Sequence, residues 1–226
     1  QALEKLAQER EFQAVALSCW PQIQADYGIA VCSTMGHLNS KGLIAACEGD
    51  VASAVSMLTL HLMTQGDVVT LMDLVSVDPD NESVLLWHCG PTSPLLADEK
   101  GTSMSRLWLF DGPDGERTGL HNDLVLKPGT GTVLGFSVDF ERLLILEGEI
   151  DNTKPSYMGS RGWLTNLRMN TQPVTTQDLV QTIMASGFQH HYPFGYGAFS
   201  EAALELAARM RIKPINVEKY KHFMSA

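Results

Sequence analysis

The amino-acid sequence predicts two regions of different fold class: an α/β region, followed by a mostly antiparallel β region that carries helices. Two observations support this. Helix-like and strand-like segments alternate over residues 1–65, whereas the residues after Gln65-Gly66 form apolar runs rich in Val and Leu, separated by turn-forming residues. The 226 residues are enough to bury a core as one domain or as two small ones.

The α/β region begins with QALEKLAQER, which reads as a helix already under way with no capping residue before it. We therefore expect the chain to be a piece of a longer protein. Short apolar strands are predicted at residues 14–17 and 29–32. A helix is predicted over residues 49–63, because its apolar residues follow the spacing of one buried helix face: Val51, Ala54, Val55, Leu58 and Leu62.

The β region opens with two apolar strands, residues 68–77 and 83–89, which are separated by the turn composition Asp-Pro-Asp-Asn-Glu. Gly and Pro separate the further strands that we predict, at residues 106–110, 123–126, 132–138 and 143–149. This pattern is typical of an antiparallel sheet or barrel. Two helices are predicted to close the chain, residues 176–186 with Thr175 as N-cap, and residues 200–210.

Composition and charge narrow the class of ligand. The net charge of −10 argues against a nucleic-acid partner, which normally requires a basic face, and fits a small-molecule ligand. No apolar run reaches the roughly 18 residues that a membrane span needs, and no secretory signal opens the chain. The four cysteines lack CxxC spacing and lie in apolar stretches, which favours reduced, buried thiols in a cytoplasmic protein.

Asp73 is an acidic residue in a strand that should be apolar. An unpaired carboxylate there would be costly, so Asp73 needs a partner. If residues 79–82 form the loop, Asp78 pairs with Ser83, and Asp73 lies opposite His88, close enough for both to hold one ion. The alternatives are a buried ion pair for Asp73 and a hydrogen-bonded core residue for His88, because a one-residue slip would place the two on opposite faces.

Glu48 and the pair His190-His191 are the other candidates. Glu48 comes just before the predicted helix and Gly49, so it is either a partner of the helix dipole or a carboxylate held close to a ligand. Adjacent histidines point in different directions, so we expect at most one of the pair in a given site. Two carboxylates and two imidazoles would suit Mn²⁺, Mg²⁺ or Co²⁺, with positions left open for a substrate.

Several segments together resemble L-fucose and L-arabinose isomerases. They are ACEGDVASAVSMLTLHLM, LMDLVSVD, WHCG, SRGWL and HHYPFGYG, in the family's order and over most of the chain. The resemblance implies that residues 1–65 are the C-terminal part of an α/β, Rossmann-like domain and that residues 66–226 form a β-barrel-like C-terminal domain. It also implies Mn²⁺ as the usual metal and a homo-oligomer, a trimer or a hexamer. Members of this family are longer than this chain, and the part that it lacks helps to form their sugar pocket.

By position, the resemblance implies that Glu48 and Asp73 are metal ligands and catalytic residues. It implies His191 as the C-terminal histidine ligand, and His88 as the additional ligand of the arabinose-type enzymes. The implied activity is the interconversion of an aldose and a ketose through a cis-enediol, whose negative charge a divalent ion stabilises. Glu48 is the predicted base and Asp73 the ligand and proton partner, although the two roles could be exchanged.

Trp87, His190 and Tyr192 are predicted to contact the sugar, with core packing as the alternative for the two aromatic rings. Two alternative functions stay open. One is another metal-dependent carbohydrate enzyme, such as a hydrolase or an aldolase, that uses the same ligands. The other is a non-catalytic sugar-binding module.

Overall fold

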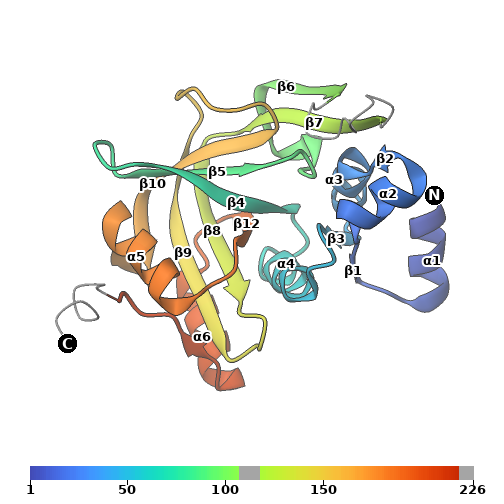
Figure 1. Cartoon of the computed structure of the whole chain (residues 1–226). Helices are drawn as coiled ribbons and strands as arrows, with labels where there is room; N and C mark the ends of the chain where they lie inside the picture. Colours follow the sequence, from blue (N-terminus) through green and yellow to red (C-terminus); the bar gives the residue numbers. More distant parts are fainter. Residues whose placement is uncertain (107–117, 219–226) are drawn as a thin grey trace.

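The computed structural model describes residues 1–106 and 118–218. The chain has a mixed α/β fold in which a large, mostly antiparallel sheet adjoins a smaller region of helices and short strands (Figure 1). The smaller region consists of α1 (Ala2–Arg10), β1 (Ala14–Ala16), the π-helix η1 (Cys19–Ile23), α2 (Gln24–Tyr27), β2 (Ile29–Ala30), α3 (Cys32–Ser40), β3 (Ile44–Ala46) and α4 (Val51–Met63). The larger region consists of β4 (Val69–Asp78), β5 (Ser83–His88), the 3-10 helix η2 (Pro94–Leu96), β6 (Ala97–Arg106), β7 (Thr118–Leu126), β8 (Gly129–Phe136), β9 (Arg142–Asp151), β10 (Ser160–Met169), β11 (Gln172–Pro173), α5 (Thr176–Ser186), β12 (His191–Tyr196), α6 (Ser200–Met210) and β13 (Lys213–Pro214).

The predicted helices are confirmed, because local capping residues determine where they begin and end. Thr175 accepts a hydrogen bond from the backbone N–H of Asp178 and starts α5, which ends at Gly187 in the left-handed region (φ 60°). In α4 the N-cap is Asp50, whose Oδ1 accepts from the N–H of Ser53 at 2.9 Å.

The smaller region contains one parallel strand pair, β1 with β3, and α4 packs on both of these strands. The predicted strand at residues 29–32 is only the short β2, which pairs with β7 of the large sheet. The opposite face of α4 packs against β8 and β12, so this helix joins the two regions (Figure 1). The Rossmann-like character of residues 1–65 and the domain boundary after residue 65 stay predictions.

Six strands of the large sheet pair in a ring. The antiparallel pairings run from β9 to β8, β12, β4, β5 and β10, and β10 pairs back onto β9. Leu, Val and Met side chains of these strands form a buried core together with Phe194 and Leu179. The position of β4 and β12 as neighbours inside this ring is what brings Asp73 and His191 side by side.

Several strands, β10 and β12 among them, were not predicted. The sequence of β10 is largely polar, and β12 contains Pro193 and Gly195, which normally argue against a central strand. β12 nevertheless pairs with β4 on one side and with β8 on the other. Hydrogen bonding to these two strands therefore outweighs the low strand propensity of Pro and Gly. The predicted strand at residues 106–110 lies mostly outside the described residues, although Arg106 ends β6.

A β-bulge in β4 corrects the predicted hairpin register. The turn is as expected, because Asp78 pairs with Ser83. The register then shifts between Leu74 and Ser76, leaving one extra residue in β4, so that Asp73 lies opposite Trp87 instead of His88. The prediction that Asp73 and His88 form a direct cross-strand pair is therefore wrong by one residue.

Asp78 at the hairpin end gives a prediction about acid stability. Hydrogen bonds from Lys154 and Asn81 lower the pKa of Asp78 from 3.8 to about 2. Because the pKa is lower in the folded state, this stabilisation is complete above pH 3.8 and is lost as the pH falls towards 2. We expect Asp78→Asn to be less stable than wild type at pH 6 and to lose less stability between pH 4 and pH 2. Urea unfolding at a series of pH values measures both effects, and parallel losses of stability in the two proteins would contradict the assignment.

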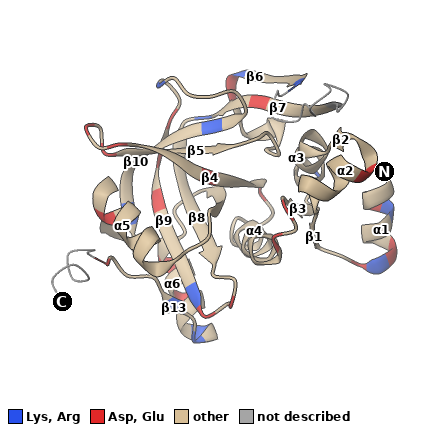
Figure 2. Cartoon of the chain, in the orientation of Figure 1, with Lys and Arg blue, Asp and Glu red and all other residues tan. Residues whose placement is uncertain are grey.

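Charged residues are spread over the surface. In the view of Figure 2, Lys and Arg of the described residues are distributed over several elements of both regions, among them α1, β6, β10 and α6. This agrees with the acidic net charge of −10. Among the described residues, no helix has both the length and the apolar character that a membrane span requires.

Candidate metal and sugar site

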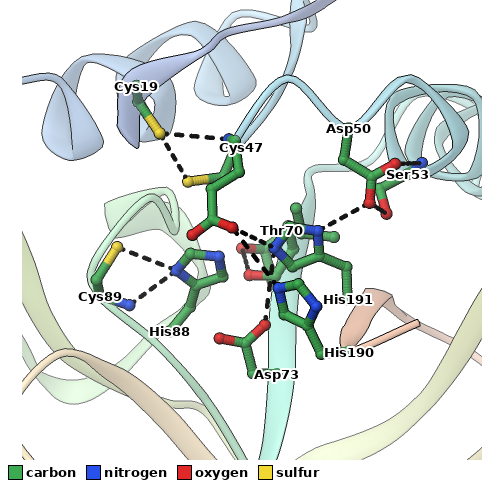
Figure 3. A network of polar contacts seen from close by, with 12 residues as sticks. Cys19, Cys47, Asp50, Ser53, Thr70, Asp73, His88, Cys89, His190 and His191 are labelled. Carbon is green, nitrogen blue, oxygen red and sulfur yellow. Dashed lines mark hydrogen bonds and ion pairs between the residues drawn. The ribbon is translucent and has the colours of Figure 1, made fainter. Parts of the chain in front are cut away.

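Four of the predicted site residues meet where the two regions join. Glu48 lies in the loop between β3 and α4, Asp73 in the middle of β4, His88 at the end of β5 and His191 at the start of β12. Figure 3 shows the side chains of Asp73, His88 and His191 directed towards a common space, with His190 beside them. Ligand atoms of Asp73, His88 and His191 lie within 4.8 Å of one another, and so do those of Glu48, His190 and His191.

His191 has the geometry of an oriented metal ligand. It is 2% exposed, and its Nδ1 lies 2.8 Å from Oδ2 of Asp50. Because an ionised carboxylate can only accept a hydrogen bond, Nδ1 of His191 carries the ring proton. The lone pair of Nε2 then faces the site. Nε2 is 3.9 Å from Oδ1 of Asp73 and 3.9 Å from Oε2 of Glu48. A carboxylate behind a histidine is the usual arrangement around protein-bound metals.

Three buried polar atoms at this point lack a hydrogen-bond partner within the described part of the chain: Oδ1 of Asp73, Nε2 of His88 and Nε2 of His191. Burying a polar atom without a hydrogen bond costs free energy of folding, so three such atoms facing one space indicate that a ligand normally binds them. Two ligand atoms that are each about 2.1 Å from a metal lie roughly 3.0 Å apart when the ligand–metal–ligand angle is about 90°. They lie roughly 4.2 Å apart when they are on opposite sides of the metal. The 3.9 Å separations from Nε2 of His191 to each acid fall within this range. Glu48 and Asp73 do not belong to one group of ligand atoms within 4.8 Å, so Glu48 would have to move towards Asp73 for all three residues to bind one ion.

His88 is oriented differently. Its Nδ1 accepts a hydrogen bond from the backbone N–H of Cys89 at 2.8 Å, which places the proton of the ring on Nε2. Burial lowers the pKa of His88, but the negative charges of Asp73 and Cys47 outweigh it and raise the pKa. With the ring proton on Nε2, His88 is a hydrogen-bond donor in this conformation, and it would have to turn its ring to bind a metal.

Asp50 was not identified from the sequence as a site residue. Burial raises its pKa, but the hydrogen bonds from His191 and Ser53 outweigh this and lower the pKa to about 2. Asp50 is therefore a carboxylate that caps α4 and orients His191 at the same time. The only signal in the sequence is its position three residues before Ser53, which predicts an N-cap and not a site residue.

Glu48 has a strained backbone. Its φ is 58°, in the left-handed region that favours glycine, and the next residue, Gly49, has φ 71°. These two residues turn the chain from β3 into α4 and direct the Glu48 side chain towards Nε2 of His190, at 3.6 Å. Strain of this kind persists where the surrounding structure holds it, and it is frequent in functional sites.

The strain gives a test that separates stability from function. We expect Glu48→Gly to raise the free energy of unfolding by up to about 1 kcal/mol, because glycine relieves the left-handed conformation. Glu48→Gln, which keeps the side chain and its strain, should leave stability unchanged. Both variants should bind Mn²⁺ more weakly. Urea unfolding without metal, followed by Mn²⁺ titration, measures the two properties, and a clear loss of stability in Glu48→Gly would contradict the strained assignment.

A pocket of about 260 Å³ opens beside these residues and is lined by Trp20, Trp87, Glu48, Asp73 and His88, together with four cysteines and apolar side chains. Trp87 lines this pocket, with its Nε1 donating to the carbonyl of Met158, and its contact with a sugar stays a prediction. His190 is exposed beside Glu48.

Tyr192 does not line the pocket. It is 3% exposed, and its ring packs beside Phe188 in the core of the large sheet, with the two ring centroids 6.2 Å apart. The core-packing alternative therefore describes Tyr192, because it points to the opposite face of β12 from His191. Trp20 takes a place in the pocket that was not predicted from the sequence.

The chain is similar to curated sulfoquinovose isomerases. It is 27% identical over 213 residues to that of Priestia megaterium (strain ATCC 12872 / QMB1551), covering 93% of this chain and 45% of the relative. It is 27% identical over 220 residues to that of Alkalicoccus urumqiensis, covering 96% of this chain and 47% of the relative. The chain thus spans slightly less than half the length of these relatives, and no family model matches it. The similarity is to sugar isomerases, while the narrower resemblance to L-fucose and L-arabinose isomerases stays a prediction.

Proposed function

We propose that this chain forms the metal-binding part of an aldose–ketose isomerase. The observation that carries the proposal is that Nε2 of His191, which is buried and without a partner among the described residues, lies 3.9 Å from the similarly unpartnered Oδ1 of Asp73 and 3.9 Å from Oε2 of Glu48. Three ligands of this type leave positions free for two neighbouring oxygens of a sugar. The similarity to curated sugar isomerases supports the same activity.

Glu48, Asp73 and His191 would hold the ion, which we propose to be Mn²⁺, or Mg²⁺ or Co²⁺. When bound, it would supply positive charge to stabilise the enediolate that forms between carbons 1 and 2 of the sugar. Asp50 keeps the proton of His191 on Nδ1 and so keeps Nε2 available as a ligand. In its present orientation, His88 would donate from Nε2 to Asp73 or to an oxygen of the sugar.

Glu48 is the proposed base. Its side chain is 38% exposed and that of Asp73 is 19% exposed, so Glu48 has more room to move between two neighbouring carbons. It would take the proton from carbon 2 of the aldose and return it to carbon 1, while Asp73 and His88 hold the hydroxyl hydrogens in place. Trp87 and His190, on either side of the acids, are the residues that we propose contact the sugar.

The substrate that we propose is an aldose, with sulfoquinovose as the first compound to test because the similar curated proteins carry its name. The described lining of the pocket holds two carboxylates and no Lys or Arg. We therefore place the uncharged end of the sugar, carbons 1 and 2, in this pocket. A homo-oligomer, as the family resemblance implies, is part of the same proposal and can be measured by light scattering.

The test is an isomerase assay in D₂O with the longest native polypeptide that contains this chain, loaded with Mn²⁺. We expect metal-dependent conversion of aldose to ketose, with deuterium at carbon 1 of the ketose detected by NMR. Cleavage products would instead indicate a hydrolase or an aldolase. Sugar binding that survives chelation, without turnover, would indicate a binding module.

The role of Asp50 gives a further prediction. Asp50→Asn keeps the shape of the side chain and an N-cap oxygen, but its amide can donate to Nδ1 of His191 and move the proton to Nε2. We expect Mn²⁺ affinity to fall by about 10–100-fold, with little change in thermal stability. Asp67→Asn, at an exposed position before β4, is the matched control. Unchanged Mn²⁺ affinity in Asp50→Asn would show that the carboxylate does not orient a ligand.

A further inference from the structure

All four cysteines of the chain lie in one buried cluster. Cys19 begins η1, Cys32 begins α3, Cys47 follows β3 and Cys89 follows β5, so four separate segments contribute one thiol each. Each cysteine is at least nine-tenths buried, between 1% and 9% exposed. Isolated buried thiols behave as small apolar residues, and nothing in that role requires all of them to meet.

The thiols lie in two close pairs. Sγ of Cys19 is 3.0 Å from Sγ of Cys47, and Sγ of Cys32 is 3.5 Å from Sγ of Cys89. The two pairs are linked, because ligand atoms of Cys47, Cys89 and His88 lie within 4.8 Å of one another. In a tetrahedral zinc–thiolate site, with metal–sulfur distances of about 2.3 Å, neighbouring sulfurs lie about 3.8 Å apart. The sulfurs of each pair are already closer than this, whereas the four sulfurs do not all lie within 4.8 Å of one another, so the two pairs would have to approach each other to enclose one ion.

The surroundings of the thiols suit a bound cation. The backbone N–H of Glu48 donates to Sγ of Cys19 at 3.3 Å, as backbone amides do around metal-bound sulfur. All four cysteines line the pocket beside Asp73, which gives an ion a path to them.

We propose that Cys19, Cys32, Cys47 and Cys89 form a second metal site, which takes a thiophilic cation of the Zn²⁺ type and is distinct from the oxygen- and nitrogen-rich site of Glu48, Asp73 and His191. Sulfur ligands select such cations, whereas carboxylates select Mn²⁺ or Mg²⁺, so the two sites differ in the metal that they bind. Cys47 is bonded directly to Glu48. An ion at the thiols would therefore hold the strained turn that carries the proposed base.

The test is a titration of the reduced chain with Co²⁺, whose bonds to thiolates give intense sulfur-to-cobalt charge-transfer bands in the near ultraviolet. We expect these bands in wild type and in Asp73→Asn, which alters only the other site, and their removal on addition of Zn²⁺. The bands should be lost in the double variant Cys32→Ala/Cys89→Ala. Bound Zn²⁺ should also slow the modification of the thiols by a disulfide reagent at least about 10-fold, a measurement on wild type that needs no folded variant.

Three results would overturn the proposal. The first is the absence of sulfur-to-cobalt bands from the folded, reduced wild type. The second is bands of equal strength in the double cysteine variant. The third is a titratable thiol count of two after aerobic preparation without metal, which would indicate a Cys19–Cys47 disulfide instead. None of these results affects Mn²⁺ binding by Glu48, Asp73 and His191, so the two proposals succeed or fail separately.

Discussion

Asp73→Asn is expected to weaken Mn²⁺ binding by more than about 100-fold and to lower kcat by at least about 10³-fold, because it removes the charge of a partly buried ligand that lies 3.9 Å from Nε2 of His191. The amide has the size of the carboxylate, and Oδ1 of Asp73 has no hydrogen-bond partner among the described residues. Thermal stability without metal should therefore change little. Mn²⁺ titration monitored by electron paramagnetic resonance, together with the isomerase assay, measures the two effects.

The control for this variant is again Asp67→Asn, which makes the same chemical change at an exposed position. If Asp73→Asn bound Mn²⁺ as tightly as the control, the orphaned Oδ1 would need another partner, and the shared site would be ruled out. A variant that binds Mn²⁺ normally but does not turn over sugar would place Asp73 in proton transfer alone.

Phe194→Ala is expected to lower the free energy of unfolding by about 3–5 kcal/mol. Phe194 is fully buried on β12, in the core of the strand ring, and its ring packs against Gly131 so closely that a Cβ there would lie 2.2 Å from it. Removal of the ring would leave a cavity that the surrounding strands cannot readily fill. Urea unfolding of the metal-free chain, with the m-value checked for two-state behaviour, measures the loss.

Tyr157→Ala removes an aromatic ring of similar size at a position that is 61% exposed, so it should cost no more than about 0.5 kcal/mol. A loss of less than about 1 kcal/mol for Phe194→Ala would show that the strand ring repacks easily. The position of His191, three residues away on the same strand, would then not be rigid.

Local sequence signals were sufficient to predict α1, α4, α5 and α6 and about half of the strands, but not α2 or α3. The predicted bounds of α5 and α6 match the structure, because caps such as Thr175 and Gly187 act within one helical turn. The predicted α4 is two residues too long at its start, since Asp50 is the cap. β12 was not predicted as a strand, because its pairing with β4 and β8 depends on residues far away in the sequence.

The sequence predicted several residues that lie near one another in the candidate site, but not the strand register that positions them. Glu48 and Asp73 each lie 3.9 Å from Nε2 of His191, whereas the bulge in β4 shifts Asp73 away from a direct pairing with His88. No local pattern could reveal the bulge, because the apolar residues of β4 fit either register. The role of Asp50 and the meeting of the four cysteines depend on contacts between segments that lie up to 141 residues apart.

The strand ring divides the site into a rigid part and an adjustable part. Asp73 and His191 lie on strands whose two edges are both hydrogen-bonded, so they separate only if entire ladders open. Glu48 lies on a loop that two neighbouring left-handed residues form. The rate at which a bound ion exchanges with solvent should therefore be set by the rate at which this loop opens. The lifetime of a bound ion would then depend on Glu48 and its neighbours, while selectivity among ions would depend on the sheet.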